Sequence, residues 1–159
     1  VEGIRVEAFH ETARLGTDLP ETTEEAQFNV AWTYEVQNKH DEALQEFNNL
    51  LKKYPSTKFL DTVYKVMASI YLKKKDIENA VAMYRKIVEN ESFDYDTRRA
   101  AQYYIGKIYE REGDYIKAIE EYQKLIKNFP EPHSEPAHPS NEIDEAYINK
   151  LKEKISKPG

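Results

Sequence analysis

The chain has 159 residues, of which 33% are charged and 40% are hydrophobic, and its formal net charge is −6. The excess of negative charge argues against general nucleic-acid binding. The sequence has no cysteine, which excludes disulfides, and it has no run of about 20 apolar residues, so we expect no direct membrane insertion. Charged and apolar residues in these proportions suit a stack of amphipathic helices.

Residues 1–20 contain one helical candidate, with Ile4, Ala8 and Leu15 on a shared face. This stretch is either the second helix of a helix pair whose first helix is absent or a simple N-terminal cap. Because the chain begins with Val1 rather than methionine, we expect it to be a piece of a longer protein.

The central part of the chain carries three predicted helix pairs. Thr22 and Glu25 have the spacing of a capping box, which predicts that a helix begins at Thr23. Lys75 occupies the turn position that Gly113 fills in the last pair, where a left-handed backbone would cost a lysine about 1 kcal/mol. The expected helices run over residues 23–37, 41–53, 57–74 and 77–89, followed by two helices within residues 99–130.

The last helix pair has a distinct expected core. Gly113 would end the first helix with a positive φ, and Asp114 would cap the second. Gly106 and Ala118 fall at mid-helix, where we expect the two backbones to come close. The apolar stripes that we expect to be buried are Tyr104, Ile105, Ile108 and Tyr109 on the first helix and Ile116, Ile119, Tyr122, Leu125 and Ile126 on the second.

The composition changes after Phe129. Residues 130–140 contain four prolines and cannot form a regular helix, so we expect a flexible, solvated connector over residues 131–140. Some of its side chains are candidate metal ligands, but their spacing fits no structural zinc pattern, and we expect no bound metal. These candidates are Glu131, His133, Glu135 and His138.

A helical pattern resumes over residues 141–156. Its apolar residues recur four apart, at Ile143, Tyr147, Leu151 and Ile155. We expect this helix to cover the last apolar face of the helix pairs; alternatively, it begins a fourth repeat.

The helix pairs form an internal repeat. The spacing from Ala43 to Ala80 is 37 residues, and that from Ala80 to Ala118 is 38 residues. Similar residue types recur around each alanine, which indicates one repeated supersecondary unit. The matching sets are Ala43, Phe47, Leu50 and Pro55, then Ala80, Tyr84 and Ile87, then Ala118, Tyr122, Leu125 and Pro130.

This pattern resembles the tetratricopeptide repeat family over residues 22–130. The family pairs a large residue, a small residue and a tyrosine on its first helix with alanine and an aromatic residue on its second, and Gly113-Asp114-Tyr115 fits its turn. The period is longer than the roughly 34 residues of the family, and the extra residues include Tyr54-Pro55-Ser56-Thr57. Longer units of this type resemble the repeat domains of bacterial cell-envelope proteins.

The resemblance implies an all-α fold, a right-handed α-solenoid of antiparallel helix pairs with an N-terminal helix and a C-terminal capping helix. It implies a single domain over residues 1–159. The parts of this domain would be a partial repeat or cap (1–20), three repeats (22–55, 57–92 and 96–130), the connector (131–140) and the capping helix (141–156).

No catalytic motif occurs in the sequence. There is no Gly-rich phosphate loop, no His-Glu-x-x-His and no Gly-x-Ser-x-Gly. Carboxylate pairs such as Glu120-Glu121 fall on helix faces that we expect to be exposed. We therefore expect a protein that is not an enzyme and binds no cofactor.

In the resembled family, the first helices of the pairs line a concave groove, which implies that this chain binds a peptide or protein partner there. Alternatively, Phe28 and Trp32 pack on the N-terminal segment, and the lysines are ordinary solvated surface. Carboxylate-clamp chaperone adaptors use a groove asparagine, where this chain has Trp32, Ser69 and Lys107, so we disfavour that subfamily. The expected groove residues are Phe28, Trp32 and Glu35, then Lys65, Ser69 and Lys73, then Tyr103, Lys107 and Arg111.

Other functions stay open. The solenoid could space or oligomerise parts of a larger cell-envelope protein, with possible self-association, or regulate a catalytic domain of a larger enzyme. The resemblance to envelope proteins favours a bacterial assembly, and the periplasm or cell envelope over the cytoplasm.

Overall fold

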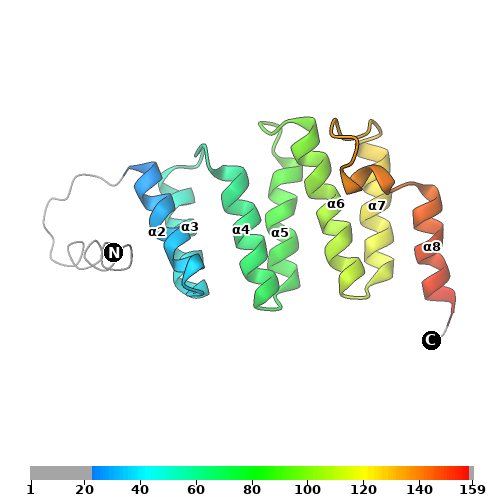
Figure 1. The fold of residues 1–159 in the computed structure, drawn as a ribbon, viewed down its shortest axis with the longest axis horizontal. Helices are drawn as coiled ribbons and strands as arrows, with labels where there is room; N and C mark the ends of the chain where they lie inside the picture. Colours follow the sequence, from blue (N-terminus) through cyan, green and yellow to red (C-terminus); the bar gives the residue numbers. More distant parts are fainter. Residues whose placement is uncertain (1–22, 158–159) are drawn as a thin grey trace, which may run out of the picture. The chain divides into compact units, whose positions relative to one another are not determined.

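The computed structural model describes residues 23–157, and this part of the chain is helical without strands (Figure 1). The chain divides into two compact units, residues 1–70 and residues 71–159. Between residues 23 and 157 we find no helix that has the length and apolar character of a membrane span. The helix expected within residues 1–20 lies outside the described part. The elements are α2 (Glu24–Val36), α3 (His40–Lys53), α4 (Leu60–Lys73), α5 (Ile77–Glu89), α6 (Tyr95–Arg111), α7 (Tyr115–Asn128), the 3₁₀ helix η1 (Pro139–Glu142) and α8 (Glu145–Ser156).

In the first unit, α2 and α3 pack as a pair around small and aromatic side chains. Ala31 of α2 lies fully buried, as do Ala43 and Phe47 of α3. The small residues let the two helices approach, and Phe47 fills the space between them. α3 ends at Lys53, as predicted, because Pro55 disfavours helical backbone at the residue directly before it.

The N-terminal cap of α2 differs from the prediction by one residue. The side chain of Thr23 accepts a hydrogen bond from the backbone N–H of Ala26 at 3.2 Å, and the helix begins at Glu24 rather than at Thr23. Glu25 lies in the first turn of the helix, and Thr22, the predicted cap, lies outside the described residues. The sequence correctly predicted a threonine cap, but it did not show which of the two adjacent threonines would be the cap.

α4 begins at Leu60, three residues later than predicted. Thr57 is buried, and its hydroxyl donates a hydrogen bond to the carboxylate of Glu24 on α2. The backbone N–H of Lys58 donates to the same carboxylate at 2.8 Å. These bonds hold residues 57–59 in a turn, which the N–H of Leu60 closes by donating to the Thr57 carbonyl at 3.1 Å.

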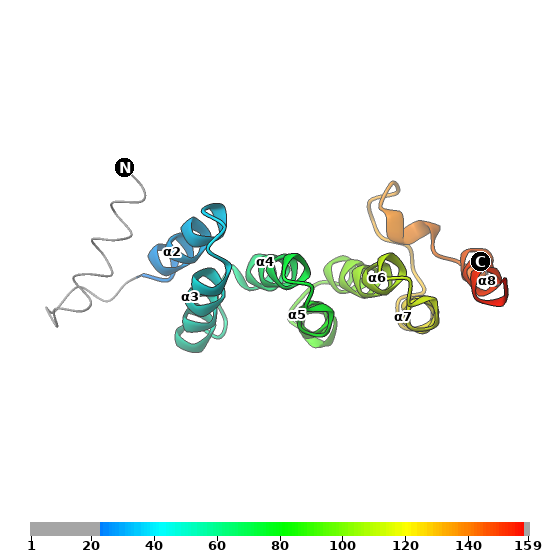
Figure 2. The ribbon, with the colours of Figure 1, turned by 90° about the horizontal axis from the view of Figure 1, so that it is seen from below.

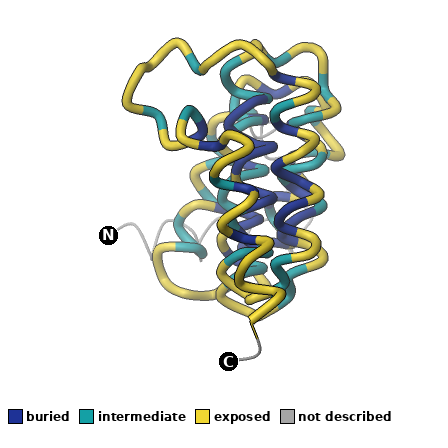
Figure 3. The backbone as a smooth tube through the Cα atoms, turned by 90° about the vertical axis from the view of Figure 1, so that its right-hand side faces the viewer, coloured by how far each residue is buried: buried dark blue, intermediate teal, exposed yellow. Residues whose placement is uncertain are grey.

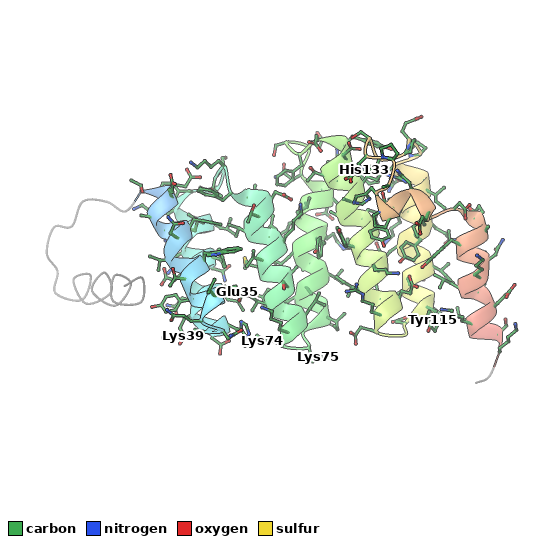
Figure 4. The ribbon with its side chains drawn as sticks, in the orientation of Figure 1. Glu35, Lys39, Lys74, Lys75, Tyr115 and His133 are labelled. Carbon is green, nitrogen blue, oxygen red and sulfur yellow. The ribbon has the colours of Figure 1, made fainter. Side chains whose placement is uncertain are left out.

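Three turns between helices use a left-handed backbone. The φ angle is 57° at Asn38, 62° at Lys75 and 77° at Gly113. The predicted equivalence of Lys75 and Gly113 is confirmed, although only glycine adopts this conformation without steric cost. Figure 4 shows Lys75 and Tyr115 at the turn end of the second unit, opposite to His133.

Replacing Lys75 by glycine should stabilise the protein by about 0.5 to 1 kcal/mol, because relief of the left-handed backbone exceeds the added entropy of the unfolded chain. The matched change Gly113→Ala should destabilise it by about 1 kcal/mol. A Cβ on Gly113 would meet no heavy atom within 4 Å, so its effect comes from the backbone alone. Urea unfolding followed by circular dichroism measures both changes. If both substitutions changed the free energy of unfolding in the same direction, the strain argument would be contradicted.

In the second unit, Gly106 of α6 packs against α7. A Cβ built on Gly106 would lie only 2.4 Å from Cε1 of Tyr122. Ala118 is fully buried in the same pair. At Gly106 the aromatic ring of Tyr122 fills the space, and the predicted close approach of the two backbones stays a prediction.

The buried face of α6 differs from the predicted stripe. Tyr104 is 36% exposed, whereas its neighbour Tyr103 is only 6% exposed. Figure 2 shows the reason, since α6 has α7 on one side and residues 131–142, which we call the connector segment, on the other. The buried face is therefore wider than one apolar stripe. On α7, the prediction that Ile116 is buried is also wrong, because it lies in the first turn and is 61% exposed.

The C-terminal helix begins later than residue 141. α8 starts at Glu145, and the side chain of Asp144 caps it by accepting a hydrogen bond from the N–H of Tyr147 at 2.8 Å. Ile148 and Leu151 pack into one core cluster with residues of α7. Figure 3 shows buried and exposed positions alternating along the helices. Ile155, which we expected on the buried side, is exposed.

Candidate interaction surfaces

An aromatic row follows α2 in the first unit. The ring of Phe28 stacks on that of Phe59 with 4.3 Å between centroids, and on that of Trp32 with 6.0 Å. Trp32 nevertheless remains 43% exposed, and Val36, one turn further on, is also exposed. Phe28, Trp32 and Val36 are spaced four residues apart and share one helix face. We call these three residues the α2 row.

The remaining predicted residues of the first unit are polar. Lys65 of α4 donates a hydrogen bond to Asp61 at 2.8 Å, and Ser69 is exposed one turn later. Glu35 lies near the turn after α2, and its Oε2 atom is 3.1 Å from Nδ1 of His40 (Figure 4). Glu35 therefore takes part in a contact within the helix pair.

In the second unit, Lys107 and Arg111 extend along one side of α6 beside Tyr104. The Lys107 ammonium lies 3.5 Å from the Glu110 carboxylate, and Arg111 is exposed in the last turn. Lys73, at the C-terminal end of α4, is exposed as well. Lys107 and Arg111 give α6 a basic edge.

Tyr103 is not accessible to a partner in this structure. Its ring lies 6.0 Å from the ring of His138 and 6.3 Å from that of Tyr122, measured between centroids. It therefore belongs to the core between α6, α7 and the connector segment. A partner would reach Tyr103 only after His138 moved.

The side chain of Glu110 connects α6 with α7 and α8 through hydrogen bonds. Its carboxylate accepts hydrogen bonds from the hydroxyl of Tyr122 on α7 at 2.7 Å and from that of Tyr147 on α8 at 2.9 Å. Burial alone would raise the pKa of Glu110, but these hydroxyl donors and the Lys107 ammonium outweigh it, and the pKa is lowered. Burial and the bond to Glu110 raise the pKa of Tyr147 to about 12. The carboxylate thus stays ionised and the phenol protonated.

A second carboxylate is buried against expectation. Glu121 on α7 accepts hydrogen bonds from Arg85 of α5 at 3.1 Å, from Gln102 of α6 at 2.8 Å and from Lys124 at 2.8 Å. The prediction that Glu120-Glu121 is exposed is therefore wrong for Glu121. Burial would raise the pKa of Glu121, but its donors prevail and lower it.

The connector segment packs on α6 through specific hydrogen bonds, although most of residues 131–140 are exposed, as expected for a solvated connector. Arg99 of α6 donates to the carbonyl of Phe129 and, at 3.0 Å, to that of Ser140. Asp96 accepts from the N–H of Ser134 at 3.0 Å and from its hydroxyl. Among the described residues we find no group of three or more candidate ligands that could hold a metal ion.

Sequence reasoning did not single out Arg99 or Asn141. Asn141 folds the segment on itself, accepting from the N–H of His133 at 2.7 Å and donating to the carbonyl of Glu135 at 3.1 Å. The sequence feature that could have pointed to Arg99 is its position one turn before Tyr103, where a charged residue interrupts an apolar helix face.

Three sequence models of the tetratricopeptide repeat match the chain, over residues 25–57, 63–93 and 99–132. The chain belongs to the tetratricopeptide repeat family. The predicted family and the α-solenoid class of fold are thus confirmed. No curated protein sequence matches this tetratricopeptide repeat protein.

Solved structures share the fold. The N-terminal domain of stress-induced protein-1 from C. elegans is 19% identical, with a TM-score of 0.58 and coverage of 84% of this chain and 94% of that one. A tetratricopeptide repeat protein from Parabacteroides merdae is 18% identical, with a TM-score of 0.60 and coverage of 95% and 54%. The first tetratricopeptide domain of Spaghetti (RPAP3), bound to the HSP90 peptide SRMEEVD, is 16% identical, with a TM-score of 0.54 and coverage of 89% and 100%. These likenesses establish the helix-pair fold alone.

Proposed function

We propose that this tetratricopeptide repeat protein is a non-enzymatic protein-interaction module that binds a peptide or protein segment on the first helices of its pairs. The observation that supports this most is the α2 row. Trp32 is a large, partly exposed aromatic side chain on a helix, and Phe28 already fixes its orientation by stacking. Rigid aromatic anchors of this kind dominate binding energy at many interfaces.

The charged residues favour a partner with acidic as well as apolar side chains. Lys65 and Lys107 each share their charge with a neighbouring carboxylate, at 2.8 Å and 3.5 Å. Arg111 is exposed at the end of α6, where its planar guanidinium suits a carboxylate. We therefore assign the α2 row of the first unit to apolar anchoring and, as a separate contact within the second unit, Arg111 to the recognition of an acidic group.

The Spaghetti domain holds an acidic peptide, SRMEEVD. Our proposal for the present chain is a different peptide class, because Trp32, Ser69 and Lys107 stand where carboxylate-clamp adaptors have a groove asparagine. The longer repeat period supports, as part of the same proposal, a place in a larger bacterial assembly such as one of the cell envelope.

A structural or oligomerising role is the second candidate. Ile116 on α7 and Ile155 on α8 are exposed apolar side chains outside the first helices. Self-association through such residues would make the repeats a spacer rather than an adaptor. Light scattering over a range of protein concentrations separates the two, since a spacer gains mass without any ligand.

The adaptor proposal is tested by affinity capture from lysate of the native source, followed by calorimetric titration of the identified partner. Trp32→Ala should weaken binding at least about tenfold, and Arg111→Glu should weaken it in a salt-dependent way. Ile116→Ala is the matched control, because Ile116 is exposed but lies on a second helix. Loss of binding in the control, with full binding by Trp32→Ala, would overturn the proposal.

A further inference from the structure

Two histidines of the connector segment stack face to face. The rings of His133 and His138 are 4.0 Å apart between centroids and 8° from parallel. The His138 ring also meets the edges of the Tyr103 and Tyr104 rings, at 6.0 Å and 6.5 Å. The histidine pair therefore forms the part of the segment that covers α6.

Both histidines use Nδ1 as a hydrogen-bond acceptor. The backbone N–H of Glu135 donates to Nδ1 of His133 at 3.0 Å. The N–H of Ser140 donates to Nδ1 of His138 at 3.2 Å, and the Ser140 hydroxyl lies 2.8 Å from the same atom. A neutral imidazole accepts at only one nitrogen, so this geometry requires the proton of each ring to sit on Nε2.

Protonation is incompatible with these contacts. In the imidazolium both ring nitrogens are donors, so Nδ1 would face an N–H donor instead of accepting from it. Protonation of both rings would also place two positive charges in stacking contact, near the Arg99 guanidinium that binds the Ser140 carbonyl.

We propose that the connector segment is a pH-sensitive cover of α6, held in place while His138 is neutral and released when it is protonated. The released part is the region around His138, since Asp96 holds Ser134 on one side of it and Arg99 holds the Ser140 carbonyl on the other. Release would remove His138 from Tyr103 and Tyr104.

The charged groups around His138 have opposing effects on its protonation. Asp96 of α6 and Glu135 of the segment attract a proton toward the His138 imidazole, whereas Arg99 and the His133 ring oppose protonation. Burial is the largest effect on His138 and, with the nearby cationic charge, lowers its pKa. The contribution of neutral His138 to stability is therefore complete above the unfolded pKa of about 6.5 and is lost as the pH falls through the lower folded pKa.

The anchor at Ser134 should survive in the same range. The hydrogen bonds from the Ser134 hydroxyl and N–H lower the pKa of Asp96, so Asp96 remains ionised while His138 titrates. The segment would thus open between its contacts at Ser134 and at the Ser140 carbonyl. That this opening exposes a binding surface on α6 rests on the proposed function, whereas the opening itself does not.

The test is an NMR titration of the full chain from about pH 7.5 to about pH 5, the range in which histidine changes charge. We expect the amide signal of Ser140 to move with the imidazole signals of His138. The nuclear Overhauser effects between the His138 and Tyr103 rings should disappear, while those between Tyr122 and Tyr147 remain. Unchanged amide signals and ring contacts across this range would overturn the proposal.

The matched variant is a double variant that carries both His133→Asn and His138→Asn. The asparagine oxygen can accept the same N–H bond two residues on, but it does not titrate. We expect the amide of Ser140 to lose its pH response; a response like that of the wild type would show that another group drives it. If circular dichroism shows that the double variant is unfolded, His138→Asn alone should remove the response of Ser140. These readouts involve no partner, so they do not depend on the proposed function.

Discussion

Replacing Tyr122 by alanine should lower the free energy of unfolding by about 3 to 5 kcal/mol, as expected for truncation of a large buried aromatic side chain. Tyr122 is fully buried, and its ring fills the space that Gly106 leaves open. It also packs edge-on against Tyr147 of α8, with 5.6 Å between the ring centroids. Urea unfolding followed by circular dichroism measures the loss.

The control Tyr122→Phe keeps the ring and removes only the hydroxyl that donates to Glu110. Because Tyr147 still donates to this carboxylate, we expect a loss of about 1 kcal/mol. Similar losses in Tyr122→Phe and Tyr122→Ala would show that the hydrogen bond, rather than the ring packing, stabilises this cluster.

Replacing Arg99 by alanine should cost about 3 kcal/mol, because two carbonyls would lose a charged donor in a buried site. The guanidinium donates to Phe129, the C-terminal cap of α7, and to Ser140. The partial negative charge at a helix C-terminus favours a cation there. The free energy of unfolding and the amide shift of Ser140 report the two consequences, lower stability and release of the connector segment.

Two further variants separate charge, donors and volume at Arg99. Arg99→Lys keeps the charge but has no planar fork to reach both carbonyls, so we expect a partial loss. Arg99→Met fills the volume without donors and should lose more stability than Arg99→Lys. A methionine variant as stable as the wild type would mean that the hydrogen bonds add nothing beyond packing.

The helix pairs could be predicted from the sequence because short-range signals determine them. Apolar periodicity, Asp114 as a cap and the left-handed turn positions at Lys75 and Gly113 depend on neighbouring residues only. Register errors occurred where local signals were ambiguous. The adjacent threonines before α2 are one case, and Thr57, whose bond to Glu24 delays α4, is another.

Contacts between distant segments could not be predicted in the same way. The prolines of the connector segment exclude a regular helix, but they do not reveal that Asn141 and Arg99 hold it on α6. That packing buries Tyr103 and leaves Tyr104 at the edge. The sequence predicted that Glu121 is exposed because it is a charged residue on a helix. Its position in the helix does not show that Arg85, Gln102 and Lys124 all donate hydrogen bonds to it.

The proposed binding residues also fall into two groups, those that are exposed as expected and those that contact other parts of the chain. The exposure of Trp32 and Arg111 agrees with their expected position on first helices, while Tyr103 and Glu35 make contacts within the chain. Whether Phe28 and Trp32 also meet the N-terminal segment concerns residues outside the described part. Binding by all nine residues therefore stays a prediction.

The attachment of α8 has a consequence for engineering longer repeat arrays. Ile148 and Leu151 occupy the side of α7 that a following repeat would need for its own first helix. A designer who joins another repeat directly to α7 must delete α8 and thereby loses the bond between Tyr147 and Glu110. Extension at this end is thus an exchange of one packed helix for another rather than a simple addition, and its success depends on whether the new helix supplies an equivalent phenol.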